Sequence, residues 1–362
     1  MRARDGSLIF VAAGSLAWVI APCHAANGPY VEAETLTYSE NFTIDSLFNN
    51  FEGDKFSPDG NSTFTHDHAA IGWRQGKWDI AAIARYDYQT EYASGAAQVL
   101  FASSNSLPIA PGDYDLSVRA NHARAFGLRI GYYHQFSKTI QGSVHFSGLY
   151  ADELTDGALV GHSTVSPDGD VTGQLALDYH YTADFLFDRN FAEPEGYGYA
   201  VDIAAKWSPS PRWAFDVEIN DVVSQIFWQD APRTIADVDT STTSIGADGL
   251  LSVRPVLRGQ NSFEDFEQQY DPRISIKARY AGIGNWAFSQ SAFMVRDTFL
   301  TTSELAYVWD EHRSLSTLFE WETGAVGLAA RYNLLEARLV TDSIDSNAAR
   351  YIDVIIALNK QY

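Results

Sequence analysis

Cysteine and methionine are scarce in this 362-residue chain, which has one cysteine and two methionines. The single cysteine, Cys23, lies in the first 25 residues, where Pro22 occupies the position at which a lipid-anchor site needs a small residue. Cleavage after Ala25 would leave no cysteine at all, which excludes a disulfide framework and a thiolate metal site. We therefore predict no metal site and no cofactor.

Basic residues are also scarce, with 25 Lys and Arg against 46 Asp and Glu. Without residues 1–25 these numbers become 23 and 45, and the net charge is near −22. Such a chain lacks the clustered cations that bind phosphate, so nucleic acid is excluded as a partner. The acidity is consistent with solubility and acidic loops, or with a cation-favouring interior and divalent-cation contacts on the outer surface.

Long apolar runs are missing too, and the apolar stretch 8–20 is well short of the roughly 20 residues that span a bilayer. Arg2 and Arg4 precede this stretch and Ala25 ends it, which is the pattern of a cleavable signal peptide. We predict cleavage after Ala25, with Ala26 as a near-equal alternative. The predicted division is a signal peptide over 1–25 and one domain over 26–362.

Alternating apolar and polar residues are abundant. Hydrophobic residues make up 46% of the chain and aromatics 14%, spread over many short segments. Period-two alternation predicts strands with one apolar and one polar face. It occurs in segments 78–88, 140–150, 171–185, 197–207, 213–220, 273–280 and 326–334. Aromatic residues gather near the segment ends, as in the interfacial girdles of a membrane barrel.

Turn lengths alternate in a regular way. Short turns are expected at 75–77, 136–138, 208–211, 282–285 and 310–313, and long polar loops at 40–65, 91–115 and 230–271. With 157–165 counted as a strand, about 16 strands place all five short turns on one side. We predict an all-β fold, a transmembrane antiparallel up-and-down β-barrel of about 14–16 strands, with periplasmic short turns.

The last strand ends on an aromatic residue. Val354, Ile356, Leu358 and Tyr362 follow an alternating pattern, which Lys360 interrupts. This pattern resembles the C-terminal assembly signal of Gram-negative outer-membrane proteins. The resemblance implies export to the cell outer membrane, with the barrel-assembly machinery, outer-membrane lipid and lipopolysaccharide as partners. The segment 196–213 resembles a strand–turn–strand of fatty-acid-transporter-like and TraF-like barrels.

The alternation also predicts which charged residues face the lumen. The predicted lumen-lining and selectivity residues are Asp178, Asp184, Asp202, Asp216, Glu218, Arg273, Lys277 and Arg279, and the wider lumen-facing set includes Asp79, Arg85 and Asp87. Acidic residues precede residue 220 and basic ones follow 272, so charges on opposite walls would set a transverse field, or pairs would stiffen the wall. These residues favour a porin-like channel for hydrophilic solutes or an exported polymer.

Two other function classes stay open. A non-conducting barrel could act as a receptor, adhesin or assembly component through its long loops. A barrel enzyme acting on lipid or polysaccharide ranks last. Its candidate pair, His145 and Ser147, resembles the His-x-Ser pair of outer-membrane phospholipase A, but both side chains are expected to face the lumen. We therefore predict no enzyme activity and no catalytic residue.

Two further clusters could bind cations. His66-Asp67-His68 offers two imidazoles at positions i and i+2, which would need further ligands. Glu264-Asp265-Phe266-Glu267, followed by Asp271, could bind Ca²⁺ or cation-bridged lipopolysaccharide, or could be part of a solvated loop.

Overall fold

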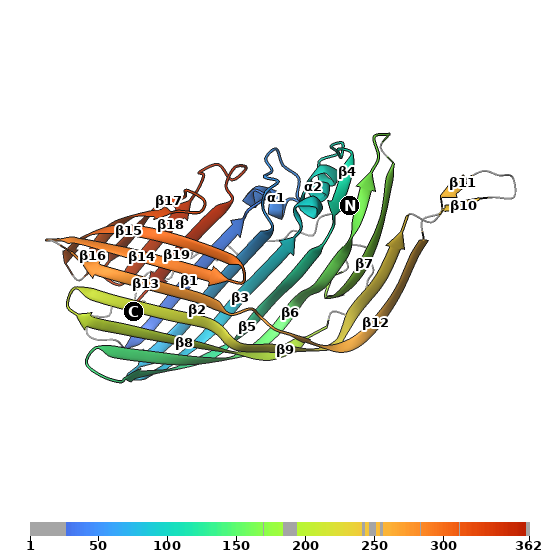
Figure 1. The fold of residues 1–362 in the computed structure, drawn as a ribbon. Helices are drawn as coiled ribbons and strands as arrows, with labels where there is room; N and C mark the ends of the chain where they lie inside the picture. Colours follow the sequence, from blue (N-terminus) through green and yellow to red (C-terminus); the bar gives the residue numbers. More distant parts are fainter. Residues whose placement is uncertain are drawn as a thin grey trace.

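The computed structural model describes residues 27–168, 170–183, 194–240, 243–245, 251–253, 256–282, 284–310 and 312–359. Fourteen antiparallel strands form a closed barrel (Figure 1), which confirms the predicted fold class at the lower strand number. Its strands are β1 (Gly28–Ser39), β2 (Ser62–Gln75), β3 (Trp78–Tyr92), β5 (Val118–Gln135), β6 (Ile140–Val165), β8 (Gly196–Ser210), β9 (Trp213–Asp239), β13 (Arg273–Ala281), β14 (Trp286–Val295), β15 (Thr298–Asp310), β16 (Arg313–Glu320), β17 (Val326–Tyr332), β18 (Leu335–Thr341) and β19 (Tyr351–Leu358).

The barrel closes through its first and last strands. β1 pairs with β19 in antiparallel register, from Val31 opposite Leu358 to Tyr38 opposite Tyr351. Closure matters because lipid offers no partner to a backbone amide, so a spanning sheet must leave no edge unpaired.

The outer face of the barrel is apolar. Each strand exposes at least one apolar side chain, namely Val31, Ile71, Ile80, Leu128, Val144, Ile203, Val217, Ile276, Phe288, Leu305, Leu315, Leu328, Leu339 and Ile356. Exposed rings flank this band on the short-turn side at Trp73, Trp78, Phe136, Trp207, Trp213, Trp286, Trp309 and Tyr332, and on the other side at Tyr150, Tyr197, Phe227, Phe299, Phe319 and Trp321. A closed barrel with such a band and two aromatic girdles spans a membrane.

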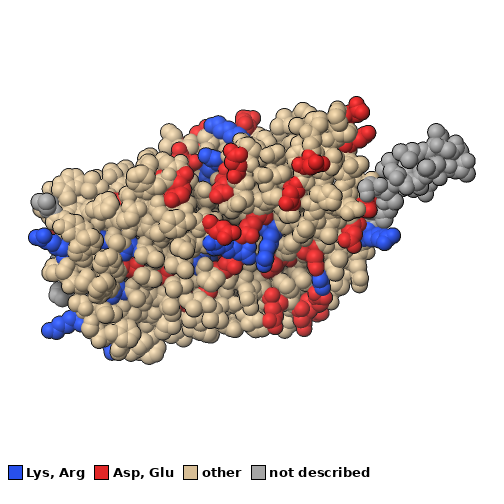
Figure 2. All heavy atoms as spheres, in the orientation of Figure 1, with Lys and Arg blue, Asp and Glu red and all other residues tan. Residues whose placement is uncertain are grey.

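The two ends of the barrel differ in their connections. The five predicted short turns lie at one end, together with the start of β1 and the end of β19. Each of these turns joins a strand that runs toward this end to the next strand, which runs away from it. The opposite end carries longer segments with two helices, α1 (Ile44–Phe48) and α2 (Ser94–Ser104). Among the described residues, no helix is long and apolar enough to cross a membrane. Figure 2 shows acidic side chains gathered over the half with the long segments.

Beyond the aromatic girdle on the long-loop side, four strands, β6, β7 (Val171–Tyr181), β9 and β12 (Val256–Gln268), form a part that we call the extension. The outer halves of β6 and β9 pair with β7, and β9 also pairs with β12. Three short strands complete this end, β4 (Gly112–Asp115), β10 (Thr243–Ile245) and β11 (Leu251–Val253). The prediction of a separate strand at 157–165 was wrong, because these residues are the outer end of the 26-residue β6.

The interior of the barrel is filled in its outer half. One apolar cluster joins β1 and β2 to the strands that follow β13, with Leu36, Tyr38, Phe64, Val295, Leu300, Leu318, Val340 and Tyr351 buried together. A second cluster packs large side chains such as Trp228 and Tyr270 over small ones on the opposite side, where Ala123, Ala125, Ala151 and Ala200 are fully buried. Side chains rather than a separate plug domain therefore fill this half of the described barrel.

Candidate functional site

A buried group of two arginines and two aspartates crosses the barrel interior. We call Arg85, Asp87, Asp221 and Arg273 the crossbar. Arg85 donates two hydrogen bonds of 2.8 Å to the Asp221 carboxylate and one of 2.9 Å to Asp87. Arg273 bonds both carboxylates, with 2.7 Å between its Nη2 and Asp221 Oδ2. Since β5, β6 and β8 lie between β3 and β9 along the wall, these bonds bridge the lumen.

The backbone at Asp221 aims its carboxylate at the arginines. Asp221 has φ of +58°, in the left-handed region that Asp tolerates better than most residues, and a bulge interrupts the β8–β9 pairing beside it. Its N–H donates to Asp202 Oδ1 at 2.8 Å, which fixes the bulge. The Asp221 side chain is fully buried, with 0% of its surface exposed.

Two aromatic side chains flank the crossbar. His66 Nδ1 lies 2.7 Å from Asp87 Oδ1, and the guanidinium of Arg85 lies 4.3 Å from the ring centre of Tyr270. Tyr270 follows β12, whose last residue, Gln268, bonds the side chain of Asn121 and the carbonyl of His122 on β5. The segment between β12 and β13 therefore lies across the interior beside the crossbar.

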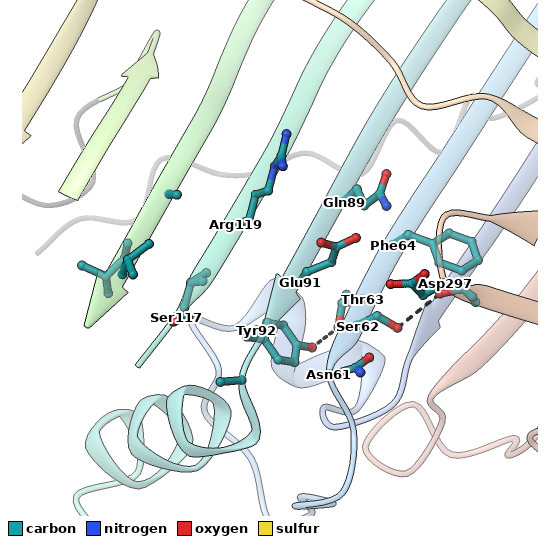
Figure 3. Close-up of a pocket in the computed structure, with 16 residues that line it drawn as sticks. Asn61, Ser62, Thr63, Phe64, Gln89, Glu91, Tyr92, Ser117, Arg119 and Asp297 are labelled. Atoms are coloured by element: carbon teal, nitrogen blue, oxygen red, sulfur yellow. Dashed lines mark hydrogen bonds between the residues drawn. The ribbon is translucent and has the colours of Figure 1, made fainter. Parts of the chain in front are cut away.

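A cavity lies above the crossbar at the outer mouth. This outer cavity has a volume of about 360 Å³, and the ends of β2, β3 and β5, the outer part of β6 and the β14–β15 turn line it (Figure 3). A smaller cavity of about 30 Å³ shares Phe64 and Gln89 with it and is lined further down by Asp87, Tyr270 and Arg273. The crossbar thus forms the floor of a narrowing path.

On the side of β1, β3 and β5 the opposite half of the interior is also filled, with Asp79 fully buried and Arg129 14% exposed, while on the side of β8, β9 and β13 it is open and polar. Inward positions there carry charged side chains that are about one third exposed, such as Asp216 and Lys277, each 35% exposed. Lys277 bonds Glu304 at 2.8 Å across the neighbouring strand β14, and Lys206 Nζ lies 4.0 Å from Asp216. We call this region, lined by Lys206, Asp216, Glu218, Lys277 and Arg279, the periplasmic half, after the predicted orientation of the short turns.

Most predicted lumen residues on β8, β9 and β13 occupy inward positions. In the β9–β13 register Lys277 lies opposite Asp216 and Arg273 opposite Asn220. The two strands are hydrogen-bonded neighbours, so the acidic and basic residues lie side by side. The idea of charges on opposite walls was wrong, because β13 pairs directly with β9 although a long segment separates the two strands in the sequence.

Asp178 and Asp184 do not join this group. Asp178 lies on β7, in the extension outside the fourteen barrel strands, so its prediction as a lumen residue was wrong. Arg233 bonds it with two hydrogen bonds of 2.7 and 2.8 Å, which lower the pKa of its carboxyl group. Asp184 lies outside the described residues.

The other candidate groups have structural partners. His145 Nε2 lies 3.1 Å from the Tyr133 hydroxyl, and Ser147 is buried in the same wall. In the triplet 66–68 the two imidazoles point inward and Asp67 outward, and Thr35 donates a hydrogen bond to Asp67. Within the described ranges, no group of three His, Cys, Asp or Glu side chains is arranged to hold a metal ion.

The acidic cluster of β12 is divided among separate partners. Glu264 bonds Arg233 at 2.9 Å and lies 3.0 Å from His180, while Glu267 accepts from Gln225. Asp271 lies beyond the strand and accepts from Arg296 Nε at 2.5 Å. These carboxylates do not converge on one point.

The C-terminal strand presents its predicted apolar face to the exterior. Ile356 and Leu358 are about half exposed on the barrel surface, and Val354 shares their face. Tyr362 and Lys360 lie outside the described residues, as does the predicted signal peptide.

Sequence reasoning missed Asp221. The predicted alternating segment ended at residue 220, and since Ile219 and Val223 share the parity of Asp221 and face outward, strict alternation would place Asp221 toward lipid. The sequence signal that could have revealed this residue is the break in the apolar pattern, because a lone Asp on an apolar face marks either a bulge or an error of register.

The closed barrel, its apolar exterior and its unequal ends define the class of outer-membrane β-barrels. No protein-family model and no curated protein matches the sequence. Among solved structures, the chain is similar to the Pseudomonas putida toluene transporter TodX (9% identity, 93% of this chain and 91% of that one, TM-score 0.44). It is also similar to the Ralstonia pickettii toluene transporter TbuX (11%, 92% and 89%, 0.34) and the Escherichia coli outer-membrane protease OmpT (8%, 92% and 91%, 0.24).

Proposed function

We propose that this protein is a gated channel that passes small hydrophilic solutes across the outer membrane. The observation that carries the proposal is the crossbar, which lies between the outer cavity and the polar periplasmic half. A barrel wall needs no such bridge for its own hydrogen bonding. Four buried charges in mutual contact form a barrier that either stays closed or opens as a unit.

The lining supports a polar solute. Below the crossbar the inward side chains on β8, β9 and β13 are charged and partly exposed, so an apolar solute would have to displace water from ionised groups there. Gating would consist of breaking the two contacts that join β3 to the opposite strands, Arg85 with Asp221 on β9 and Asp87 with Arg273 on β13, while Arg273 and Asp221 remain on neighbouring strands.

Single-channel recording in planar bilayers tests the proposal. The variant Arg85→Gln with Asp221→Asn removes both charges of the central pair and keeps comparable side-chain volumes. A tenfold rise in mean current would correspond to about 1.4 kcal/mol in the closed–open equilibrium, and we expect at least this rise, because the contact of Asp87 with Arg273 is then the only one of the crossbar that still spans the lumen. The control, Arg233→Gln with Asp178→Asn, removes the same charges on the extension and should conduct as the wild type does.

A correctly folded barrel that stays silent in both the wild type and the crossbar variant would refute the channel. A wild type that is already permanently open, with the current of the variant, would refute the crossbar as its gate.

A receptor function is the second candidate, and the extension favours it. β6, β7, β9 and β12 project beyond the outer girdle and form a large ordered surface on the side of the long loops. Recognition of lipopolysaccharide or another surface ligand would use this part. A silent crossbar variant would support this candidate.

A further inference from the structure

The outer cavity presents charges of opposite sign from different parts of the barrel. Arg119 extends from β5, and Asp297 belongs to the turn between β14 and β15. Figure 3 shows the two residues on opposite sides of the cavity, with Glu91 between them. Within the described part of the chain, neither Arg119 nor Asp297 has a hydrogen bond or a salt bridge.

The other charges at the mouth are already paired. Glu91 is bonded by Arg296 Nη1 at 2.8 Å, and the same arginine binds Asp271 through Nε at 2.5 Å. Glu91 is therefore occupied, and a solute in the cavity meets Arg119 and Asp297 as the available charges. Asp156 on β6 lies near Arg119 without contacting it.

Neutral groups complete the lining. Ser62, Gln89 and Thr298 can donate or accept hydrogen bonds, while Phe64 and Val160 offer apolar contacts. The volume of about 360 Å³ lies in the range of small-molecule pockets. It can hold a solute with a charged group at each end and an apolar middle.

We propose that the outer cavity binds a small zwitterion, with Arg119 contacting its carboxylate and Asp297 its ammonium group. This inference rests on the proposed channel function and names the class of solute that the channel admits. Arginine suits a carboxylate because its guanidinium can donate two parallel hydrogen bonds. A solute with only one charged group would pair with one of these two side chains and leave the other, Arg119 or Asp297, without an opposite charge.

Binding of a dipeptide and its blocked forms tests the inference. The probes are glycyl-phenylalanine, its N-acetyl derivative, which keeps only the carboxylate, and its amide, which keeps only the ammonium. Calorimetric titration of the refolded barrel should show the dipeptide binding about tenfold more tightly than either blocked form, the value of one charged hydrogen bond.

Two variants assign the ends of the ligand. Arg119→Gln should weaken dipeptide binding about tenfold and leave the amide unaffected, and Asp297→Asn should do the same while sparing the N-acetyl form. Arg258→Gln and Asp59→Asn change exposed charges that do not line the cavity and should leave binding unchanged. Equal affinity for the three probes, or no binding by folded protein, would overturn the inference.

The two proposals can fail separately. If the crossbar variant conducts and no dipeptide binds, the zwitterion site alone is refuted. If the dipeptide binds with the predicted pattern and every variant is silent in bilayers, the channel is refuted and the cavity is the site of a receptor.

Discussion

The two halves of the barrel interior use charge in different ways. In the outer half, Arg85, Asp221 and Arg273 are almost fully buried and each has at least two bonds to an opposite charge. In the periplasmic half, Asp216 and Lys277 are one third exposed, and their contacts are to near neighbours on the wall. Pairs of opposite charge thus form a barrier in the crossbar and a hydrated lining beside β9 and β13, and burial makes the difference.

The largest expected effect is on the free energy of unfolding, which should respond differently to substitutions in the two halves. Asp221→Ala leaves two buried guanidinium groups without their shared carboxylate, which should lower the free energy of unfolding by about 3–5 kcal/mol. Asp216→Ala removes a half-solvated contact and should cost less than about 1 kcal/mol. Urea unfolding of the barrel in lipid bilayers measures both. Equal losses would mean that the crossbar is no more buried in solution than the periplasmic half.

Ion selectivity sharpens the comparison, because selectivity should reside in the half that stays hydrated. In the background of Arg85→Gln with Asp221→Asn, the further change of Lys277 and Arg279 to Gln should raise the cation-to-anion permeability ratio about twofold or more. Reversal potentials in asymmetric KCl report this ratio. An unchanged potential would show that solutes do not pass beside β13.

Dipeptide binding in the outer cavity should depend on pH. Burial raises the pKa of Asp156 to about 6, against the opposing pull of Arg119 and Arg296 and with support from Asp271. Above this pKa the Asp156 carboxylate is charged and competes for Arg119, while below it the side chain is neutral. Dipeptide affinity should therefore rise about threefold from about pH 7 to about pH 5, where the dipeptide keeps its ammonium group, a nearby unit charge being worth about 1 kcal/mol or less in a hydrated site.

The variant Asp156→Asn is the control for this titration. It should bind with the affinity of the acidic form at both pH values. A pH dependence that persists in Asp156→Asn would assign the titration to another group.

The smallest effect is expected on the extension. Asp178→Asn should change neither conductance nor stability by a measurable amount, within about 0.5 kcal/mol, since its pair with Arg233 is solvent-exposed. A clear change in conductance would place β7 in the permeation path after all.

Alternation sufficed to predict the barrel wall, because lipid outside and water inside impose period two on each spanning strand. It predicted the inward positions of Arg85, Asp87 and Arg273. It could not predict that they meet, since contacts across the lumen depend on the cross-section and on the bulge at Asp221. Asp178 was placed wrongly because the strands of the extension alternate as regularly as those of the barrel wall, so the pattern cannot tell the two apart.

The outer cavity was beyond sequence reasoning for a further reason. Arg119 and Asp297 are 178 positions apart, each in a segment that reads as a strand end or a turn. Only the closure of β1 on β19 and the tilt of the strands bring these segments to one mouth.

Thiol labelling from one side tests the division of the lumen most directly, because residues 26–362 contain no cysteine. Glu218→Cys places a thiol in the periplasmic half and Gln89→Cys places one in the outer cavity. In oriented proteoliposomes, an impermeant maleimide should label Cys at 218 only from the short-turn side and Cys at 89 only from the long-loop side. Addition of Arg85→Gln with Asp221→Asn should allow labelling of both from either side. Equal labelling of both positions from either side in the barrel with an intact crossbar would contradict the account.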